Sequence, residues 1–534
     1  MNFIDYFIII FYLIGLLVLG YFFKKNKSSN DYFLGGRSMG WGPLTLSTMA
    51  TQLSAISFIS APAFVGLKEG GGLQWLTFEF GVPLAMAFLM IAIVPTLYKS
   101  GVVSVYEYLE KRFDASSRLI ISFVFQISRS VAAGVMIYTM SLILQSAFDV
   151  DFWISILIIG VITLIYSYQG GMKAVIWGDV IQMIILFIGI IICLVYGLNE
   201  LGGIENFINN VDKDRISAVD FKKLGFSNAN KTDEFGFWPM VIGGFFLYAS
   251  YYGTDQTQSQ RLLSAKNMGT IKKLLFANAF FRFPITLVYC IMGLILGTLF
   301  FQDISFQESL NEIYINNISS VEGKKADLMV PVFIITYLPN GIIGILIIAI
   351  MSAAMSSLSS AINSLSAVTM EDFIKRFNPN ISDEKYVFQS RLLSLFWGSI
   401  CLFFALLTGN IEGTIIEVIN KIGSVFYGPI LGAFILAIMT KKTHALGANI
   451  GIILGVLFNI YLWLYVPEIF WFWWNAIGCF ITVFFGISVS LIINKKINKA
   501  DNVVYFAGKR EIVILVFYFS FIVALSLILP SFLS

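Results

Sequence analysis

Hydroxyl side chains gather between residues 351 and 364 of this 534-residue sequence, directly after an apolar run at 342–350. Polar groups at membrane depth cost free energy unless they face a partner, a cavity or an ion. A row of neutral oxygens suits a hard cation such as Na⁺, whereas the same small residues also let helices pack closely. Both interpretations stay open from these residues alone. The side chains that share one helix face by their spacing are Ala353, Ser356, Ser357, Ser360 and Ser364.

A second candidate group is the guanidinium of Arg129, which lies near the middle of an apolar run at 119–147. An arginine inside the membrane marks a functional site by default, and its planar fork matches a carboxylate. The alternative is a structural ion pair with Glu79 or Asp179. Arg282 lies closer to the end of its own apolar run, so we expect it to snorkel toward the membrane surface.

The sequence does not indicate an enzyme. It has no nucleophile–base pair, no ATP-binding Walker loop and no zinc-binding HExxH motif. The four cysteines lie in apolar runs without metal-ligand spacing, and the single histidine stands alone. These features argue against catalysis and against a pump driven by ATP.

The elements that must position these side chains are membrane helices. Hydrophobic residues make up 57% of the chain and charged residues 13%, and apolar runs long enough to cross a bilayer recur throughout. We predict an all-α polytopic membrane protein with about 14 transmembrane helices. The predicted spans are 3–23, 42–66, 73–97, 119–147, 152–169, 174–198, 237–254, 274–302, 331–350 with an extension to 370, 390–410, 412–440, 445–466, 469–493 and 511–532.

The basic residues predict the orientation of these spans. With both chain ends outside, most of the 35 lysines and arginines, Arg261 among them, fall in inside loops. The net charge of +3 therefore reflects topology and gives no reason to expect a nucleic-acid partner. The first span lacks a basic leader and a cleavage site, so we expect a retained helix. The expected surroundings are the lipid bilayer of a plasma (inner) membrane.

Two spans contain signs of interruption. Thr51, Gln52, Ser54 and Ser57 cluster in the middle of span 42–66, and a proline follows. A helix broken at this depth frees carbonyl oxygens that can hold a cation. Five spans later, Gly243–Gly244 predicts a second break. Breaks at matching positions in two halves are typical of an inverted-repeat transporter.

Four segments together resemble the sodium–solute symporter family: 31–41, 170–182, 255–266 and 353–364. The resemblance covers nearly all of the chain. It implies a LeuT-like core of ten helices in two inverted five-helix repeats. The domain organisation would then be an extra helix with its inside loop at 1–40, the transport core at 41–440, and three additional helices at 441–534.

The same resemblance implies one or two Na⁺ ions as coupling ions. The first sodium site would use the backbone carbonyls of Ala50, Leu53 and Ala353 and the hydroxyls of Ser356 and Ser357. The second sodium site, known from members that include sialic acid symporters, would use Asp179, Ser356, Ser359 and Ser360.

For the transported small molecule, the resemblance implies a carboxylate such as sialic acid, because sialic acid members place an arginine at the position of Arg129. Members that take neutral sugars have other residues at Ser57 and Asp255, and a lysine near Tyr289. A neutral sugar, a vitamin, a monocarboxylate and iodide remain alternatives, with a membrane sensor as the alternative outside transport. The predicted substrate-binding residues are Ser54, Ser57, Gln74, Glu79, Arg129, Phe245, Phe246 and Asn420.

Overall fold

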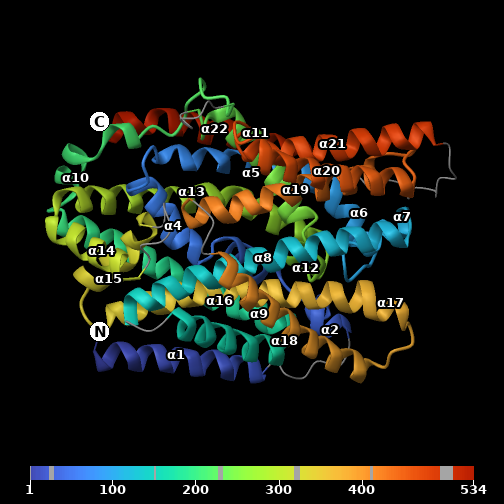
Figure 1. Ribbon diagram of the computed structural model, residues 1–534, viewed down its shortest axis with the longest axis horizontal. Helices are drawn as coiled ribbons and strands as arrows, with labels where there is room; N and C mark the ends of the chain where they lie inside the picture. Colours follow the sequence, from blue (N-terminus) through green and yellow to red (C-terminus); the bar gives the residue numbers. More distant parts are fainter. Residues whose placement is uncertain are drawn as a thin grey trace.

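A computed structural model of the chain describes residues 2–22, 29–148, 152–226, 233–317, 325–408, 413–493 and 509–533. Its secondary structure consists of helices packed side by side (Figure 1). The first half contains α1 (Phe3–Phe22), α2 (Ser29–Leu34), η1 (Gly35–Arg37), α3 (Trp41–Gln52), α4 (Ala55–Gly66), η2 (Leu73–Phe80), α5 (Gly81–Phe88), η3 (Leu89–Ile93), α6 (Val94–Lys99), α7 (Glu107–Arg112), α8 (Ala115–Phe148), α9 (Phe152–Glu200), α10 (Ile204–Asn210), η4 (Lys213–Arg215), α11 (Phe237–Gly253) and α12 (Gln256–Leu263).

The second half contains α13 (Met268–Gln302), α14 (Ile304–Asn317), η5 (Ala326–Leu328), α15 (Met329–Tyr337), α16 (Ile342–Val368), η6 (Thr369–Ile374), α17 (Lys375–Phe377), α18 (Asp383–Thr408), α19 (Ile415–Met439), α20 (Ala445–Tyr465), α21 (Phe472–Ile492) and α22 (Lys509–Leu533). Figure 1 shows the start of α1 and the end of α22 at one end of the molecule, and α7 and α17 at the other. The expectation that both chain ends lie outside stays a prediction.

Ten helices of the described residues are long and apolar enough to cross a membrane, or eleven if the bent pair of α3 and α4 counts as one span. The expected count of about 14 is therefore not confirmed. Spans 152–169 and 174–198 both lie within α9, which consists of two helices that meet at Gly171, at φ 59°; of the two, only Gly171–Glu200 is counted among the ten. The run 331–370 is divided between α15 and α16, because 338–341 contains a proline and ends on Gly341 at φ 89°.

The break predicted in the span 42–66 is confirmed. The axes of α3 and α4 differ by 54°. Leu53 leaves helical geometry, at φ −84° and ψ 74°, and Ser54 is extended. Ser54 then caps α4, because its hydroxyl accepts a hydrogen bond from the backbone N–H of Ile56 at 3.2 Å. A polar residue thus begins the second half of a broken membrane helix.

The second break was predicted at the wrong position. α11 runs through Gly243–Gly244 without interruption. Both glycines serve close packing: a Cβ at Gly243 would lie 2.3 Å from the carbonyl oxygen of Phe472, and one at Gly244 would lie 2.7 Å from that of Phe78. The helix instead ends at Gly253, and Asp255 caps α12 by accepting a hydrogen bond from the backbone of Thr257 at 2.8 Å.

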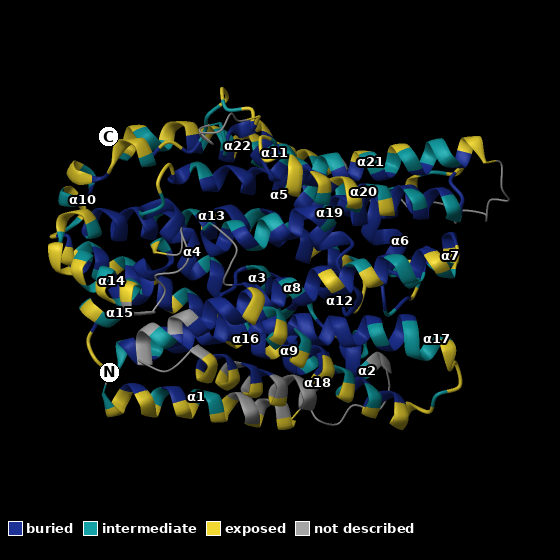
Figure 2. Cartoon of the chain, viewed as in Figure 1, coloured by how far each residue is buried: buried dark blue, intermediate teal, exposed yellow. Residues whose placement is uncertain are grey.

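The hydroxyl-rich helix α16 lies in the middle of the bundle, where it packs against α9, α8, α1 and α3. Figure 2 shows this centre as buried, while α1 and α22 contain many exposed residues. Those exposed residues include large apolar ones such as Phe7 and Phe517, which suit contact with lipid. The side chains of Ser356, Ser357 and Ser360 are at most 2% exposed. The hydroxyl face predicted from spacing therefore points into the protein.

Candidate functional site

The first predicted sodium site lies where α16 crosses the break between α3 and α4. Since the chain leaves the helix at Leu53, carbonyl oxygens in the last turn of α3 lose their usual N–H donors. The hydroxyl of Ser357 lies 3.3 Å from the carbonyl oxygen of Thr51 and 3.3 Å from that of Ala353. Thr51 lies between Ala50 and Leu53 in this turn. Neutral oxygens from two helices therefore meet here, as a sodium site requires.

Ser356 points away from this turn. Its hydroxyl donates to Oδ1 of Asp179 at 2.5 Å, so the structure joins it to the second predicted site. Asp179 lies in α9 and is buried. The hydroxyl of Ser359 donates to the carbonyl oxygen of Ser356 at 3.0 Å, within its own helix. Of the residues predicted for the second sodium site, Asp179 and Ser356 are therefore in contact, whereas the hydroxyl of Ser359 faces the backbone of its own helix.

A buried arginine, Arg261, lies in the second site. Its Nη2 donates to Oδ2 of Asp179 at 2.7 Å and to the hydroxyl of Ser360 at 2.5 Å. Oδ2 of Asp179 also accepts a hydrogen bond from the hydroxyl of Ser47 at 2.5 Å. The expectation that Arg261 lies in an inside loop is therefore wrong: a 1% exposed side chain forms an ion pair within the bundle. The arginine and Ser47 use Oδ2, whereas Oδ1 faces Ser356.

Arg129 is buried, and its ion-pair partner is Asp255. Glu79 and Asp179, the partners considered from sequence, pair with other arginines. Nη2 of Arg129 contacts the Asp255 carboxylate, and the guanidinium lies 5.3 Å from the ring centre of Tyr251. Asp255 also caps α12, so Arg129 contacts the chain at the point where α11 ends and α12 begins. Nε of Arg129 has no hydrogen-bond partner among the described residues.

A second buried ion pair joins Arg282 of α13 to Glu79 of η2. Nε and Nη2 of Arg282 lie 2.9 Å from the two carboxylate oxygens of Glu79, and Thr286 donates a further hydrogen bond at 2.9 Å. The expectation that Arg282 snorkels is wrong, because the side chain is 5% exposed and points inward. The spacing of residues 282, 286 and 289 places them on one face of α13. The sequence could therefore have indicated that they act together.

Both arginines line one internal cavity of about 90 Å³ next to the helix break. Five of the predicted substrate-binding residues line it: Ser54, Ser57, Glu79, Arg129 and Asn420. Lining residues that sequence reasoning missed include Tyr251, Arg282, Thr286, Tyr289 and Tyr427.

Three predicted substrate-binding residues do not line this cavity. The side-chain amide of Gln74 bonds back to the carbonyl of Gly70. Phe245 packs edge-on against Phe88, with ring centres 5.8 Å apart, and Phe246 packs against Phe245. All three were placed by position along the chain, which does not fix the direction of a side chain on its helix.

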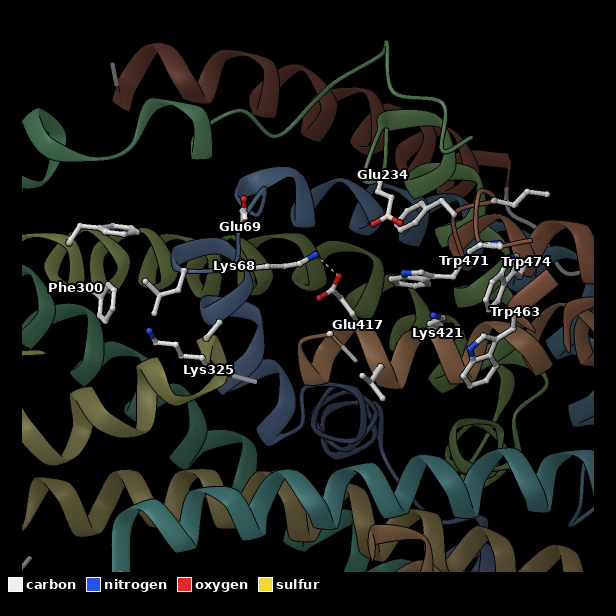
Figure 3. A pocket seen from close by; sticks show the side chains of 18 residues that line it. Lys68, Glu69, Glu234, Phe300, Lys325, Glu417, Lys421, Trp463, Trp471 and Trp474 are labelled. Atoms are coloured by element: carbon white, nitrogen blue, oxygen red, sulfur yellow. Dashed lines mark hydrogen bonds and ion pairs between the residues drawn. The ribbon is translucent and has the colours of Figure 1, made fainter. Parts of the chain in front are cut away.

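A larger pocket of about 730 Å³ lies on the other side of α19 (Figure 3). The first two turns of α19 separate the two spaces: Ile416, Ile419 and Asn420 face the small cavity, whereas Glu417, Val418 and Lys421 face the larger pocket. Nζ of Lys68, just beyond α4, lies 2.5 Å from Oε1 of Glu417. The backbone N–H of Ile416 donates to the hydroxyl of Ser60 at 3.0 Å. These bonds fasten α19 to α4.

Residues 32–455 match the profile of the sodium:solute symporter family. The chain belongs to this family. Among relatives, it is 30% identical to sodium-coupled monocarboxylate transporter 1 of Xenopus laevis, over 86% of this chain and 71% of the relative. It is 30% identical to the human sodium/iodide cotransporter, over 82% of this chain and 65% of the relative.

Solved structures agree with this family assignment. A Na⁺-coupled sialic acid symporter in a substrate-bound, outward-open state superposes with a TM-score of 0.80 and 27% identity, covering 93% of this chain and 99% of the other. The transporter Mhp1 superposes with a TM-score of 0.54 and 11% identity, which reflects a shared fold. The LeuT-like fold expected from sequence is therefore confirmed.

Proposed function

We propose that the protein imports a small organic carboxylate together with sodium, by alternating access across the plasma (inner) membrane. The observation that carries the proposal is the proximity of two features. The break between α3 and α4 brings the carbonyl oxygen of Thr51 to the hydroxyl of Ser357 of α16, and residues of the same break line the cavity that contains Arg129. An ion bound at the break would order the residues that bind the solute. Sodium binding would therefore favour solute binding.

Sodium would be a co-transported substrate. The first ion would bind between Ala50, Leu53, Ala353 and Ser357, with Ser356 completing the site if its hydroxyl turns from Asp179. A second ion would bind on the Oδ1 side of Asp179 with Ser356, because Arg261 and Ser47 use Oδ2. Each sodium that crosses the membrane contributes about 2.3 kcal/mol per 100 mV of membrane potential. Two ions with one monoanion carry net positive charge inward.

The solute carboxylate would bind at Arg129. Asp255 already pairs with Nη2, while Nε has no partner in the described structure. A buried donor without an acceptor costs free energy, so a carboxylate oxygen at this position would be stabilised.

The size of the cavity favours a short monocarboxylate. Its volume of about 90 Å³ is small beside the neighbouring pocket of about 730 Å³, which suits a small acid. The monocarboxylate transporter among the relatives supports this choice. The sialic acid symporter of similar structure supports sialic acid as a second candidate, for which the cavity would have to widen.

Uptake into liposomes containing the purified protein tests the proposal. The assay compares short monocarboxylates, sialic acid, glucose and iodide, with an inward gradient of sodium or of potassium. We expect sodium-dependent uptake of a carboxylate and none of glucose. Sodium-dependent uptake of glucose or iodide without any carboxylate would refute the assignment of the substrate class.

A further inference from the structure

The buried cavity contains unpaired polar atoms at more than one place. Among the described residues, Nη1 of Arg282, the hydroxyl of Tyr289, Oε1 of Gln52 and Nε of Arg129 are buried without a hydrogen-bond partner, and all four residues line it. Buried polar groups in proteins are nearly always paired, with protein, water or a ligand. Several such groups around one cavity indicate a site for a polar ligand.

The geometry of Arg282 restricts what it can bind. Its Nε and Nη2 hold the two oxygens of Glu79 at 2.9 Å, so the edge that grips a carboxylate in a bidentate manner is already used. Nη1 remains, and it can only donate. Because two donors of this guanidinium are already used by Glu79, the single remaining donor suits one neutral oxygen of the solute better than a carboxylate held through both of its oxygens.

Tyr289 extends the same surface. It follows Arg282 by seven residues on α13, with Thr286 between them, and all three line the cavity. The Tyr289 ring is 1% exposed and packs edge-on against Phe58, with ring centres 6.5 Å apart. That packing helps to hold the ring, and with it the position of the phenol oxygen. Two donors, Nη1 and the phenol, thus lie on one face of α13, whereas Arg129 belongs to α8.

We propose that Arg282 and Tyr289 form a second recognition point, which binds a neutral carbonyl or hydroxyl oxygen of the solute and selects hydroxy and oxo acids against plain aliphatic acids. This inference rests on the proposed carboxylate transport and adds the specificity of the same cavity. A plain acid would leave Nη1 of Arg282 buried and unpaired, and such a loss is what allows a site to reject an analogue.

The test compares three acids of equal chain length: propanoate, 2-hydroxypropanoate and 2-oxopropanoate. Binding is measured as the rise in melting temperature of the purified protein in sodium, and affinity by competition. We expect the two oxygenated acids to bind at least about tenfold more tightly than propanoate. Tyr289→Phe keeps the ring and removes one donor, so it should reduce this preference about fivefold and leave propanoate unchanged. Arg282→Lys keeps the charge facing Glu79 and should reduce the preference as well.

Tyr252→Phe is the matched control, because the Tyr252 hydroxyl is also buried without a partner yet does not line the cavity. It should keep the wild-type preference. Equal binding of all three acids by the wild type would overturn the inference while leaving carboxylate transport intact. Equal weakening of all three by Tyr289→Phe would also overturn it, since that result marks a structural role. Binding of none of them in sodium would refute the inference together with the proposal of a short monocarboxylate.

Discussion

Replacing Ser357 with alanine tests the sodium site most sharply, because this hydroxyl joins the two halves of the site. It lies 3.3 Å from the carbonyl oxygens of both Thr51 and Ala353. Losing one oxygen that contacts a buried charge costs about 1.5–3 kcal/mol. The sodium concentration for half-maximal uptake should therefore rise about tenfold or more. Two long hydrogen bonds between neutral groups contribute little to the fold, so melting without sodium should change little.

The matched control is Ser366→Ala. Ser366 lies on the same helix and is buried, but its hydroxyl donates to the carbonyl oxygen of Ser390 in α18 at 2.7 Å, away from the break. The assay is initial uptake in liposomes over a range of sodium concentrations, with melting measured in sodium and in potassium. Unchanged sodium dependence in Ser357→Ala, or an equal change in Ser366→Ala, would refute the placement of the ion.

Three further predictions concern charged residues. Reversal potentials in liposomes should give two sodiums per solute for the wild type, and Asp179→Asn should lower this ratio to one; a wild-type ratio of one would make Asp179 structural. Arg129→Lys should weaken carboxylate binding about tenfold or more, since the fork is lost while Asp255 keeps a cationic partner; near-normal affinity with a lower melting temperature would instead assign the pair to stability. Glu417→Gln removes the charge that pairs with Lys68 and should favour a state in which α19 has moved away from Lys68. A cysteine placed at Asn420 should then react faster with a thiol reagent added from the side of the larger pocket. An unchanged rate would exclude a role of this ion pair in keeping the small cavity separate from the larger pocket.

Much of the fold was predictable because apolar runs and polar interruptions report directly on membrane helices. The break at Leu53 and Ser54 was visible in a cluster of polar residues, and the inward face of α16 in the spacing of its serines. The glycine pair in α11 misled, since glycine signals close packing as readily as a break. The turn at 338–341 was marked by proline and glycine and was hidden by the apolar residues on both sides.

The pairing of charges could not be predicted, because each pair joins segments far apart in the chain. Arg261 meets Asp179, Arg282 meets Glu79, and Arg129 meets a residue more than a hundred positions away. The sequence singled out Arg129, whereas it placed Arg261 in a loop and Arg282 near the membrane surface, and it could not identify the partner of any of the three. The direction of side chains could not be predicted either. Gln74 lies near Glu79 in the chain, yet its side-chain amide donates to the backbone carbonyl of Gly70 and does not enter the cavity.

Coupling itself is tested most directly by concentrative uptake. Liposomes that contain the protein receive a labelled short monocarboxylate at equal concentration inside and outside, with sodium only outside. Because the ion and the solute share the break between α3 and α4, the solute should accumulate above its outside concentration, more so with a negative interior, and should leak back when an ionophore dissipates the sodium gradient. Simple equilibration, at the same rate with potassium in place of sodium, would contradict the account.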